Sequence, residues 1–398
     1  MGWDPRSRRT AILLTSLVAL GPLSTDLYLP SLPAMVDVFG TDVARVQLTL
    51  SVFLVGFALS QLAYGPLSDR FGRRPVLLGG LAIYCIASLA CAFATTIGGL
   101  IAARFLQALG GCCGPVIARA IVRDVHGLQR AARTLAYIGA ATALAPAIGP
   151  IIGGYLEVAF GWRSSFFALT LFGLVVLLAS VATLSETNEH RNPDATRPLT
   201  LLANYRAVLR HDAFIGYTLC VAFCYSSLFA FISGSSFVLI EVLHVAPNRF
   251  GYCFAVVVAG YLSGTLSAGR LTMRLGIDRM ISIGTLLSAL SGTVMAALAL
   301  CGVYTLSAVL VPTFFCMLAA GLVLPNAMAG ATAPFPRMAG SASALMGFVQ
   351  MGWAAFLGYL VGYLHDGTPA PMANAIGAAG WGAFASYRIV VRRTQSVA

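Results

Sequence analysis

The sequence predicts an all-α integral membrane protein with twelve transmembrane helices in two pseudo-symmetric six-helix bundles. Composition is the first observation behind this prediction: the 398 residues are 58% hydrophobic and only 10% charged, whereas a soluble domain is about a quarter charged. The second is the number of apolar stretches of roughly 20 residues, the length that a membrane-spanning helix needs. The third is a motif that recurs in the second half of the chain.

Twelve apolar stretches follow one another along the chain. The first six cover residues 10–31, 46–66, 75–95, 98–121, 134–157 and 165–185. The second six cover residues 213–240, 250–273, 280–302, 304–327, 339–364 and 371–391. The basic start resembles a secretory signal, but the apolar run continues toward Leu29 without a small-residue cleavage site, so we expect a retained first helix.

One long polar break separates the two sets of six stretches. It reads SETNEHRNPDATRPL, from Ser185 to Leu199, and is typical of a linker. We therefore expect an N-terminal half at residues 1–185, a cytoplasmic linker at 186–212 and a C-terminal half at 213–398.

The repeated motif follows the second apolar stretch of each half. It reads GPLSDRFGRR from Gly65 and GRLTMRLG from Gly269, an offset of 204 residues, with Met273 in the place of Asp69. The same place in each half indicates internal duplication, and parallel six-helix repeats are typical of one large transporter architecture. Because the second copy keeps the turn but lacks the acid, we expect an asymmetric gate.

The positive charges predict the orientation. The net charge is +11 and all 25 basic residues are Arg. Most lie in alternate short loops, a bias that marks the cytoplasmic side and places both termini there. This distribution argues against a nucleic-acid partner and for lipid headgroups at the basic face. The Arg-rich segments are Arg6 to Arg9, Arg70 to Arg74, Arg119 to Arg133, Arg191 to Arg210, Arg270 to Arg279, Arg337, and Arg388 to Arg393.

No motif indicates a metal site, a cofactor or an enzyme. The nine Cys form no CxxC pair, and Cys220 and Cys224, four residues apart on one helix face, have no His or carboxylate nearby, which favours packing. No GxxxxGK[ST], HExxH or GxSxG sequence is present. A membrane-embedded enzyme or sensor would also need a soluble output domain or a catalytic constellation.

Two charged residues, Asp26 and Arg104, lie well inside predicted helices, where charges face a partner or a water-filled cavity. At 1.5 Å per residue, Asp26 in the first helix lies about 24 Å above the cytoplasmic face, and Arg104 in the fourth about 21 Å. Desolvation favours the protonated carboxyl and a nearby Arg the ionised one, so the protonation of Asp26 would depend on conformation. A static Asp26–Arg104 bridge, or an inert Asp26 at the outer mouth, are the alternatives.

Polar and aromatic side chains in other helices are candidates for substrate contact. Gln107 shares a face with Arg104, and Gln350 is a candidate by position in the eleventh helix. Lipid-facing aromatics with serines that pack helices are the alternative for the seventh helix. The full set of expected substrate contacts is Tyr28, Gln107, Tyr225, Phe229, Ser233 and Gln350.

These residues together resemble the major facilitator superfamily, because GPLSDRFGRR is similar to its signature between the second and third helices. Four further stretches resemble its drug:proton antiporter branch for bicyclomycin and chloramphenicol resistance (Bcr/CflA). They are TDLYLPSLPAM from Thr25, QLTLSVFLVGFALSQLAYGPLSDRFGRRPVLLGG from Gln47, IARAIVRD from Ile117 and FVLIEVLHVAPNRFGYCFA from Phe237.

The resemblance implies a cytoplasmic gate at this signature. Its members would be Gly65, Asp69, Arg70, Gly72 and Arg73, with Arg119 or Arg123 as the partner of Asp69. The glycines allow a tight turn, and Asp69 is suited to cap a helix and pair with Arg. A simple topology signal is the alternative, although it explains only the arginines.

The fifth helix contains ALAPAIGPIIGGYL, from Ala143 to Leu156. Its Pro and Gly residues resemble the GPxxGG motif of antiporters, although Ala145 stands where that motif often has Gly, and ordinary small-residue packing is the alternative. The motif residues are Pro146, Gly149, Pro150, Gly153 and Gly154.

The resemblance also implies a function. We expect a monomeric, multi-pass protein of the bacterial inner membrane that exports small drugs of the bicyclomycin, chloramphenicol or sulfonamide class in exchange for protons. Proton coupling would rest on Asp26 and Arg104. A proton-coupled exporter or importer of a small metabolite, such as an amino acid or sugar, is the alternative.

Overall fold

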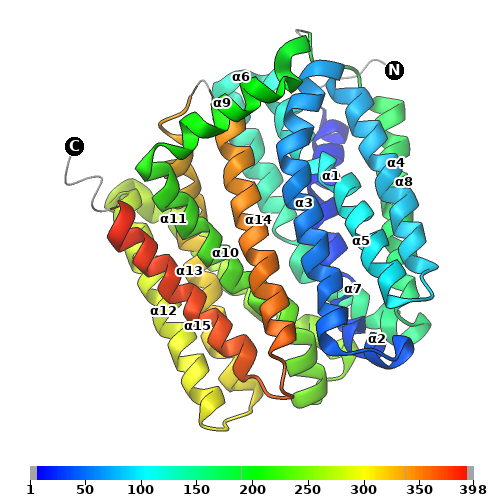
Figure 1. The fold of residues 1–398 in the computed structure, drawn as a ribbon, viewed down its shortest axis with the longest axis vertical. Helices are drawn as coiled ribbons and strands as arrows, with labels where there is room; N and C mark the ends of the chain where they lie inside the picture. Colours follow the sequence, from blue (N-terminus) through cyan, green and yellow to red (C-terminus); the bar gives the residue numbers. More distant parts are fainter. Residues whose placement is uncertain (1–6, 190, 337, 392–398) are drawn as a thin grey trace.

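The computed structural model describes residues 7–189, 191–336 and 338–391, with side chains except those of 126–133, 136 and 140. Every regular element in these ranges is helical, and the helices run side by side as two bundles (Figure 1). Of the predicted basic positions, Arg6, Arg337, Arg392 and Arg393 lie outside the described residues, as do the side chains of Arg130 and Arg133.

The first bundle comprises α1 (Arg8–Asp26), η1 (Leu29–Ser31), α2 (Leu32–Phe39), α3 (Val43–Phe71), α4 (Arg73–Ala92), α5 (Ile97–Gly111), α6 (Cys113–Thr142), α7 (Ala145–Phe160) and α8 (Arg163–Thr183). The connecting segment holds η2 (Pro193–Thr196) and α9 (Pro198–Leu209). The second bundle comprises α10 (Asp212–Ser236), the π-helical η3 (Phe237–Val242), α11 (Pro247–Leu275), α12 (Ile277–Leu300), α13 (Leu306–Thr332), α14 (Ala339–Tyr363), α15 (Ala370–Ser386) and the π-helical η4 (Tyr387–Val391).

Ten helical segments in the described ranges are long and apolar enough to cross a membrane. The other two expected spans correspond to the last part of α6 with the shorter α7, and to α15 with η4. Large apolar side chains on the outer faces of the bundles are exposed, as at Ile86, Phe160 and Leu171. Exposed apolar surface on this scale is that of a membrane protein, and the prediction of a twelve-helix, two-bundle fold is confirmed.

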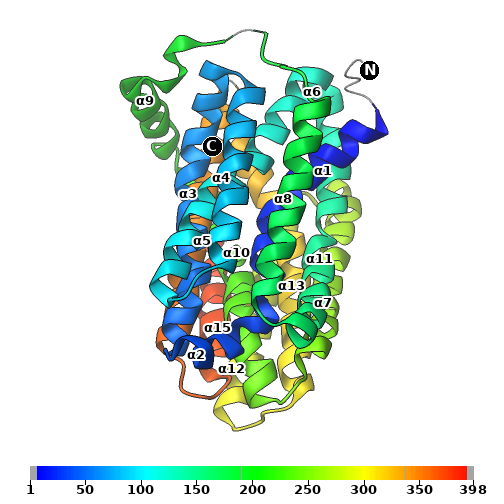
Figure 2. The same cartoon turned by 90° about the vertical axis from the view of Figure 1, so that its right-hand side faces the viewer.

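Two boundaries differ from the prediction. The basic segment from Arg119 to Arg133, expected as a loop, lies within α6, and the expected linker contains the helix α9. We call the end of the molecule with α9 and the start of α1 the basic end, and the opposite end, with α2, the far end (Figure 2). The residues of α9 lie across the basic end beside α14.

The internal duplication is visible in the turns that follow α3 and α11. Both helices have 29 residues, and each ends at a glycine with a left-handed backbone, Gly72 with φ +102° and Gly276 with φ +80°. A side chain would strain either position. The repeated motif therefore encodes the same turn twice, although its second copy carries Met273, 89% exposed, in the place of the acid.

The two bundles meet along two seams, where α3 lies against α14 and α7 against α11. At the far end the backbones of the two bundles approach each other closely. A Cβ at Gly154 would collide with the Pro247 carbonyl, and a Cβ at Gly251 would collide with the backbone of Ile151. Ser233 of α10 donates a hydrogen bond to Gln47 of α3 (3.0 Å). The far end is thus held closed by direct contacts between the bundles.

Candidate functional site

A central cavity of about 460 Å³ lies between the two bundles. It extends from Asp26 of α1 to Met328 and Ser343, which belong to the turns of α13 and α14 nearest the basic end. Its walls are largely aromatic and aliphatic, with four methionines. Because Met side chains are flexible and polarisable, such a lining accommodates apolar groups of varied shape. The methionines are Met317, Met328, Met346 and Met351.

Asp26 lies at the end of the cavity farther from the basic end and is 2% exposed. Helix α1 ends here because Pro30, four residues on, has no N–H to donate to the Asp26 carbonyl. The Thr25 hydroxyl donates to the carboxylate (2.9 Å), and Gly149 of α7 leaves room beside it. Asp26 is the one buried carboxylate within the described ranges, and a buried carboxylate changes protonation with access to water.

Arg104 occupies a separate, fully buried cluster. Its guanidinium donates to Gln107, which in turn donates to Ser88 (2.7 Å). The guanidinium carbon lies 4.5 Å from the ring centre of Tyr28 and 4.3 Å from that of Phe53. In the described structure Nε and Nη2 of Arg104 have no hydrogen-bond partner, so this is a buried cation held mainly by aromatic faces.

Asp26 and Arg104 lie at similar heights, as predicted, because the arginine stacks on Tyr28, two residues after the acid. They form no ion pair with each other. Asp26 faces the cavity, whereas Arg104 is enclosed within the first bundle. The static bridge considered as an alternative is therefore absent from this conformation.

The expected substrate contacts fall into two groups. Tyr225 and Gln350 line the cavity. The other four do not: Tyr28 and Gln107 belong to the Arg104 cluster, while Phe229 packs against Gly358 and Ser233 bonds to Gln47 across the seam. Direct substrate contact by these four has no support in this conformation.

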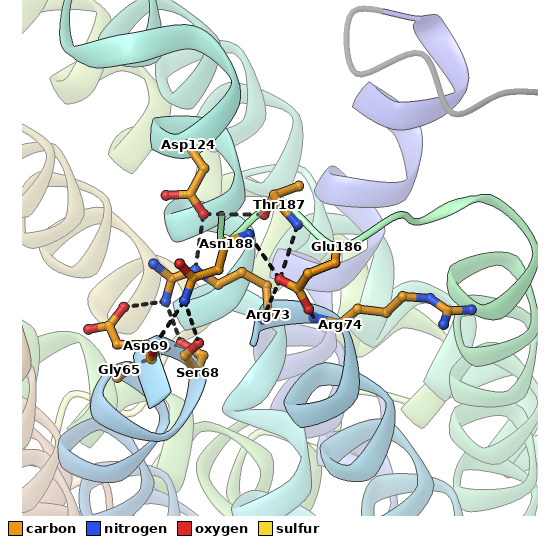
Figure 3. Close-up of polar contacts among 9 residues, drawn as sticks. All are labelled: Gly65, Ser68, Asp69, Arg73, Arg74, Asp124, Glu186, Thr187 and Asn188. Atoms are coloured by element: carbon orange, nitrogen blue, oxygen red, sulfur yellow. Dashed lines mark hydrogen bonds and ion pairs between the residues drawn. The ribbon is translucent and has the colours of Figure 1, made fainter. Parts of the chain in front are cut away.

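The signature turn carries a charged cluster at the basic end (Figure 3). Arg73 pairs with Asp69 (2.5 Å) in its own turn and with Asp124 of α6 (3.0 Å). Glu186, just after α8, accepts hydrogen bonds from the backbone N–H groups of Arg73 (2.8 Å) and Arg74 (3.2 Å), and so caps α4.

The start of the linker is bound to the same turn. The side-chain amide of Asn188 donates to the Asp69 carbonyl (3.0 Å), and the backbone N–H of Asn192 donates there too (3.0 Å). Arg70 donates to Thr196 (2.6 Å). Partial burial would raise the pKa of Glu186, but the backbone N–H groups of Asn188, Arg73, Arg74 and Thr187 outweigh it and lower the pKa below its ordinary value.

The expected partners of Asp69 need correction. Among the described residues its ion pair is with Arg73, and none joins it to Arg119 or Arg123. Arg119 instead donates to the Pro115 carbonyl (2.9 Å) and lines the cavity. Gly114 lies against Leu17, so counting along the helices places Arg119 about 20 Å from Asp26. A Cβ at Gly65 would meet nothing within 4 Å.

The Pro/Gly motif of α7 forms contacts on two sides. Pro146 lines the cavity and Gly149 faces Asp26, while Gly153 touches the Leu27 carbonyl so closely that no Cβ fits. Gly154, the next residue, faces Pro247 of the other bundle. Pro150 is buried within the helix.

Sequence reasoning missed three residues at these sites. Asp124 directly follows Arg123 in the IARAIVRD stretch, so a charged residue next to an expected gate residue could have indicated it. No sequence signal marks Glu186 or Phe53. Glu186 caps a helix that begins 113 residues earlier in the chain, and Phe53 is one phenylalanine within a long apolar stretch.

Known proteins of similar sequence include relatives named for drug resistance. The chain is 29% identical to the "Bicyclomycin resistance protein homolog" of Haemophilus influenzae, covering 92% of each chain. It is 31% identical to the "Chloramphenicol resistance protein" of Pseudomonas aeruginosa, covering 86% of this chain and 81% of the relative.

The fold agrees as well. The solved structure of the xylose transporter of E. coli in a partially occluded inward-open conformation superposes with a TM-score of 0.75 at 13% identity, over 96% of this chain and 97% of the other. The model of the Major Facilitator Superfamily matches residues 14–359. The chain is therefore a multi-pass transport protein of the inner membrane that belongs to the major facilitator superfamily, in the branch of its bicyclomycin and chloramphenicol resistance relatives.

Proposed function

We propose that this protein exports small amphipathic drugs in exchange for protons by alternating access, acting as a monomer with its basic end and both termini in the cytoplasm. Residues 1–185 and 213–398 would move against each other, joined by the linker at 186–212. The observation that carries the proposal is Asp26, a buried carboxylate without an ion-pair partner in the described structure, in a cavity lined by aromatic and Met side chains.

The chemistry follows from the change of access. In the conformation described, contacts hold the far end closed while the cavity reaches toward the basic end. A drug entering there would meet apolar walls and, beside Asp26, the side chain of Tyr225. Burial favours the neutral carboxyl and exposure to water the ionised one. Asp26 would therefore release its proton when water reaches it through the cavity open toward the basic end, where the drug binds, and regain a proton when the cavity faces the far side.

The charged cluster would control this exchange at the basic end. Asp69, Arg73 and Asp124 bind the turn to α6, and Glu186 binds it to the linker. When the bundles close at the basic end, this turn approaches the second bundle and supplies charges for a breakable contact. Arg70, Gly72, Arg119 and Arg123 complete the proposed gate. Chloramphenicol, bicyclomycin and sulfonamides are the substrates proposed, because relatives carry the first two names.

The test is proton release from inverted membrane vesicles when chloramphenicol or bicyclomycin is added. The wild type should release protons, and Asp26→Asn should not, whereas the control Asp37→Asn, at an exposed carboxylate of α2, should behave as the wild type. Equal release by Asp26→Asn would remove Asp26 from coupling. Absence of release from folded wild-type protein would contradict drug export and favour a metabolite as substrate.

A further inference from the structure

Phe53 of α3 is the one residue that belongs both to the cavity wall and to the arginine cluster of the described structure. It lines the cavity together with Asp26, and its ring lies 4.3 Å from the Arg104 guanidinium. The other two rings around Arg104, those of Tyr28 and Phe166, do not line the cavity. Among the rings that stack on Arg104, the Phe53 ring is therefore the one that also faces the cavity.

The arginine behind this ring is incompletely satisfied. Gln107 accepts one hydrogen bond, and Nε and Nη2 have no partner within the described ranges. A buried cation without a carboxylate is costly, and its free N–H groups favour an anion once one can approach. Three aromatic faces offset part of that cost. Arg104 thus keeps unused hydrogen-bond donors behind the Phe53 ring.

We propose that Phe53 is a specificity-determining partition: its ring keeps Arg104 out of the cavity, so that the end of the cavity at Asp26 accepts neutral and cationic drugs and rejects anionic ones. With the ring in place, Asp26 is the charged group at that end, because the other charged side chain of the lining, Arg119, lies about 20 Å away toward the basic end. Removal of the ring would open the Arg104 guanidinium to this end of the cavity and make it available to the carboxylate of a ligand.

Phe57 offers a matched control. It stands one turn along α3, lines the same cavity and packs against Phe53 with ring centres 6.0 Å apart. Its ring covers Gly21 of α1 and no stacking contact joins it to Arg104. Loss of either ring enlarges the cavity by the volume of one phenylalanine ring. Only the loss of Phe53 uncovers Arg104.

The first experiment measures the covering directly and needs no drug. Purified full-length protein in detergent is treated with phenylglyoxal, which modifies accessible guanidinium groups, and modified arginines are located by peptide mass spectrometry. Arg119 should react in every variant because it lines the cavity. Arg104 should be protected in the wild type and in Phe57→Ala, and react at least tenfold faster in Phe53→Ala. Protection of Arg104 in Phe53→Ala, or equal reaction in Phe57→Ala, would overturn the proposal.

A milder variant covers the case in which Phe53→Ala does not fold. Phe53→Leu keeps most of the apolar volume but loses the π-face that holds the guanidinium. It should increase the modification of Arg104 less than Phe53→Ala does, but above the wild type. Modification at the wild-type rate in Phe53→Leu would contradict the role of the ring.

The second experiment tests specificity, and this arm rests on the proposed function. Dissociation constants are measured for chloramphenicol and for its succinate monoester, which adds one carboxylate. Phe53→Ala should lower the ratio of the ester constant to the chloramphenicol constant at least tenfold, and adding Arg104→Gln should reverse that gain. An unchanged ratio in protein that binds chloramphenicol would refute the specificity role. Wild-type protein that binds neither ligand, with the labelling pattern as expected, would refute the proposed substrates and leave the partition supported.

Discussion

Arg73 of α4 and Asp124 of α6 form an ion pair, with 3.0 Å between Nε and Oδ2, at the basic end of the first bundle. Their side chains are only 11% and 24% exposed, so water screens this pair less than it screens a surface bridge. Since Arg73 also binds Asp69 in the preceding turn, one guanidinium joins α3, α4 and α6.

Asp124→Asn should therefore destabilise the protein by about 1–2 kcal/mol, because a largely buried charged hydrogen bond loses its anion. The measurement is thermal unfolding of the purified protein in detergent. Asp194→Asn is the control. Asp194 pairs with Arg197, and their side chains are 56% and 68% exposed, respectively, so this pair should contribute under about 0.5 kcal/mol. Equal losses of stability in the two variants would show that the Arg73–Asp124 pair stabilises the protein no more than an exposed ion pair does.

Gly72→Ala and Gly276→Ala should differ, although both glycines have positive φ and occupy equivalent turns. Each variant incurs backbone strain of about 1–3 kcal/mol. At Gly72 the added Cβ would also lie 2.5 Å from the Glu186 carboxylate, whereas at Gly276 it meets nothing within 4 Å. The loss of thermal stability should thus be larger at Gly72. The same loss at both positions would mean that Glu186 does not rest against this turn.

Glu186→Gln should weaken the attachment of the linker and alter its dependence on pH. The pKa of Glu186 in the folded protein is lowered from 4.5. Its contribution to stability is therefore present above about pH 4.5 and is lost as pH falls through the lower folded-state pKa.

The measurement is the unfolding temperature of wild type and Glu186→Gln between pH 6 and the lowest pH that the protein tolerates. The difference should be greatest at pH 6 and shrink toward acid. Glu189→Gln, at an exposed linker position, should match the wild type throughout. A difference that grows as the pH falls would contradict the assigned role of the carboxylate.

Gly153→Ala and Gly154→Ala should separate folding from conformational change. The Cβ at Gly153 would meet Leu27 within the first bundle, and the Cβ at Gly154 would meet Pro247 of the second. Gly153→Ala should lower stability in every conformation, because its neighbour belongs to the same rigid bundle. Gly154→Ala should instead disfavour the closed far end.

Distances between spin labels on α2 and on the loop between α12 and α13, measured in a background without cysteine, report this opening. Gly154→Ala should shift the distribution toward longer distances, and Gly153→Ala should leave its shape unchanged while lowering the unfolding temperature. Unaltered distances in folded Gly154→Ala protein would show that α7 and α11 do not form part of the seal.

The sequence by itself determined the membrane class, the number of helices, the duplication and the heights of groups along their helices. These properties are local: hydrophobic length sets a span, a rise of 1.5 Å per residue sets depth, and glycines with positive φ set the turns at Gly72 and Gly276. Arg104 accordingly stacks on Tyr28, two residues after Asp26, although the predicted depths themselves stay predictions.

Only the tertiary structure decided which groups meet. It turned Asp26 toward the cavity and Arg104 behind Phe53, made Arg73 the partner of Asp69, and brought Glu186 to the start of α4 from 113 residues away. Each depends on the rotation of a helix about its axis or on a distant segment. Nearly uniform apolar helices carry little periodic signal for rotation, and contacts between distant segments form only when the bundles pack.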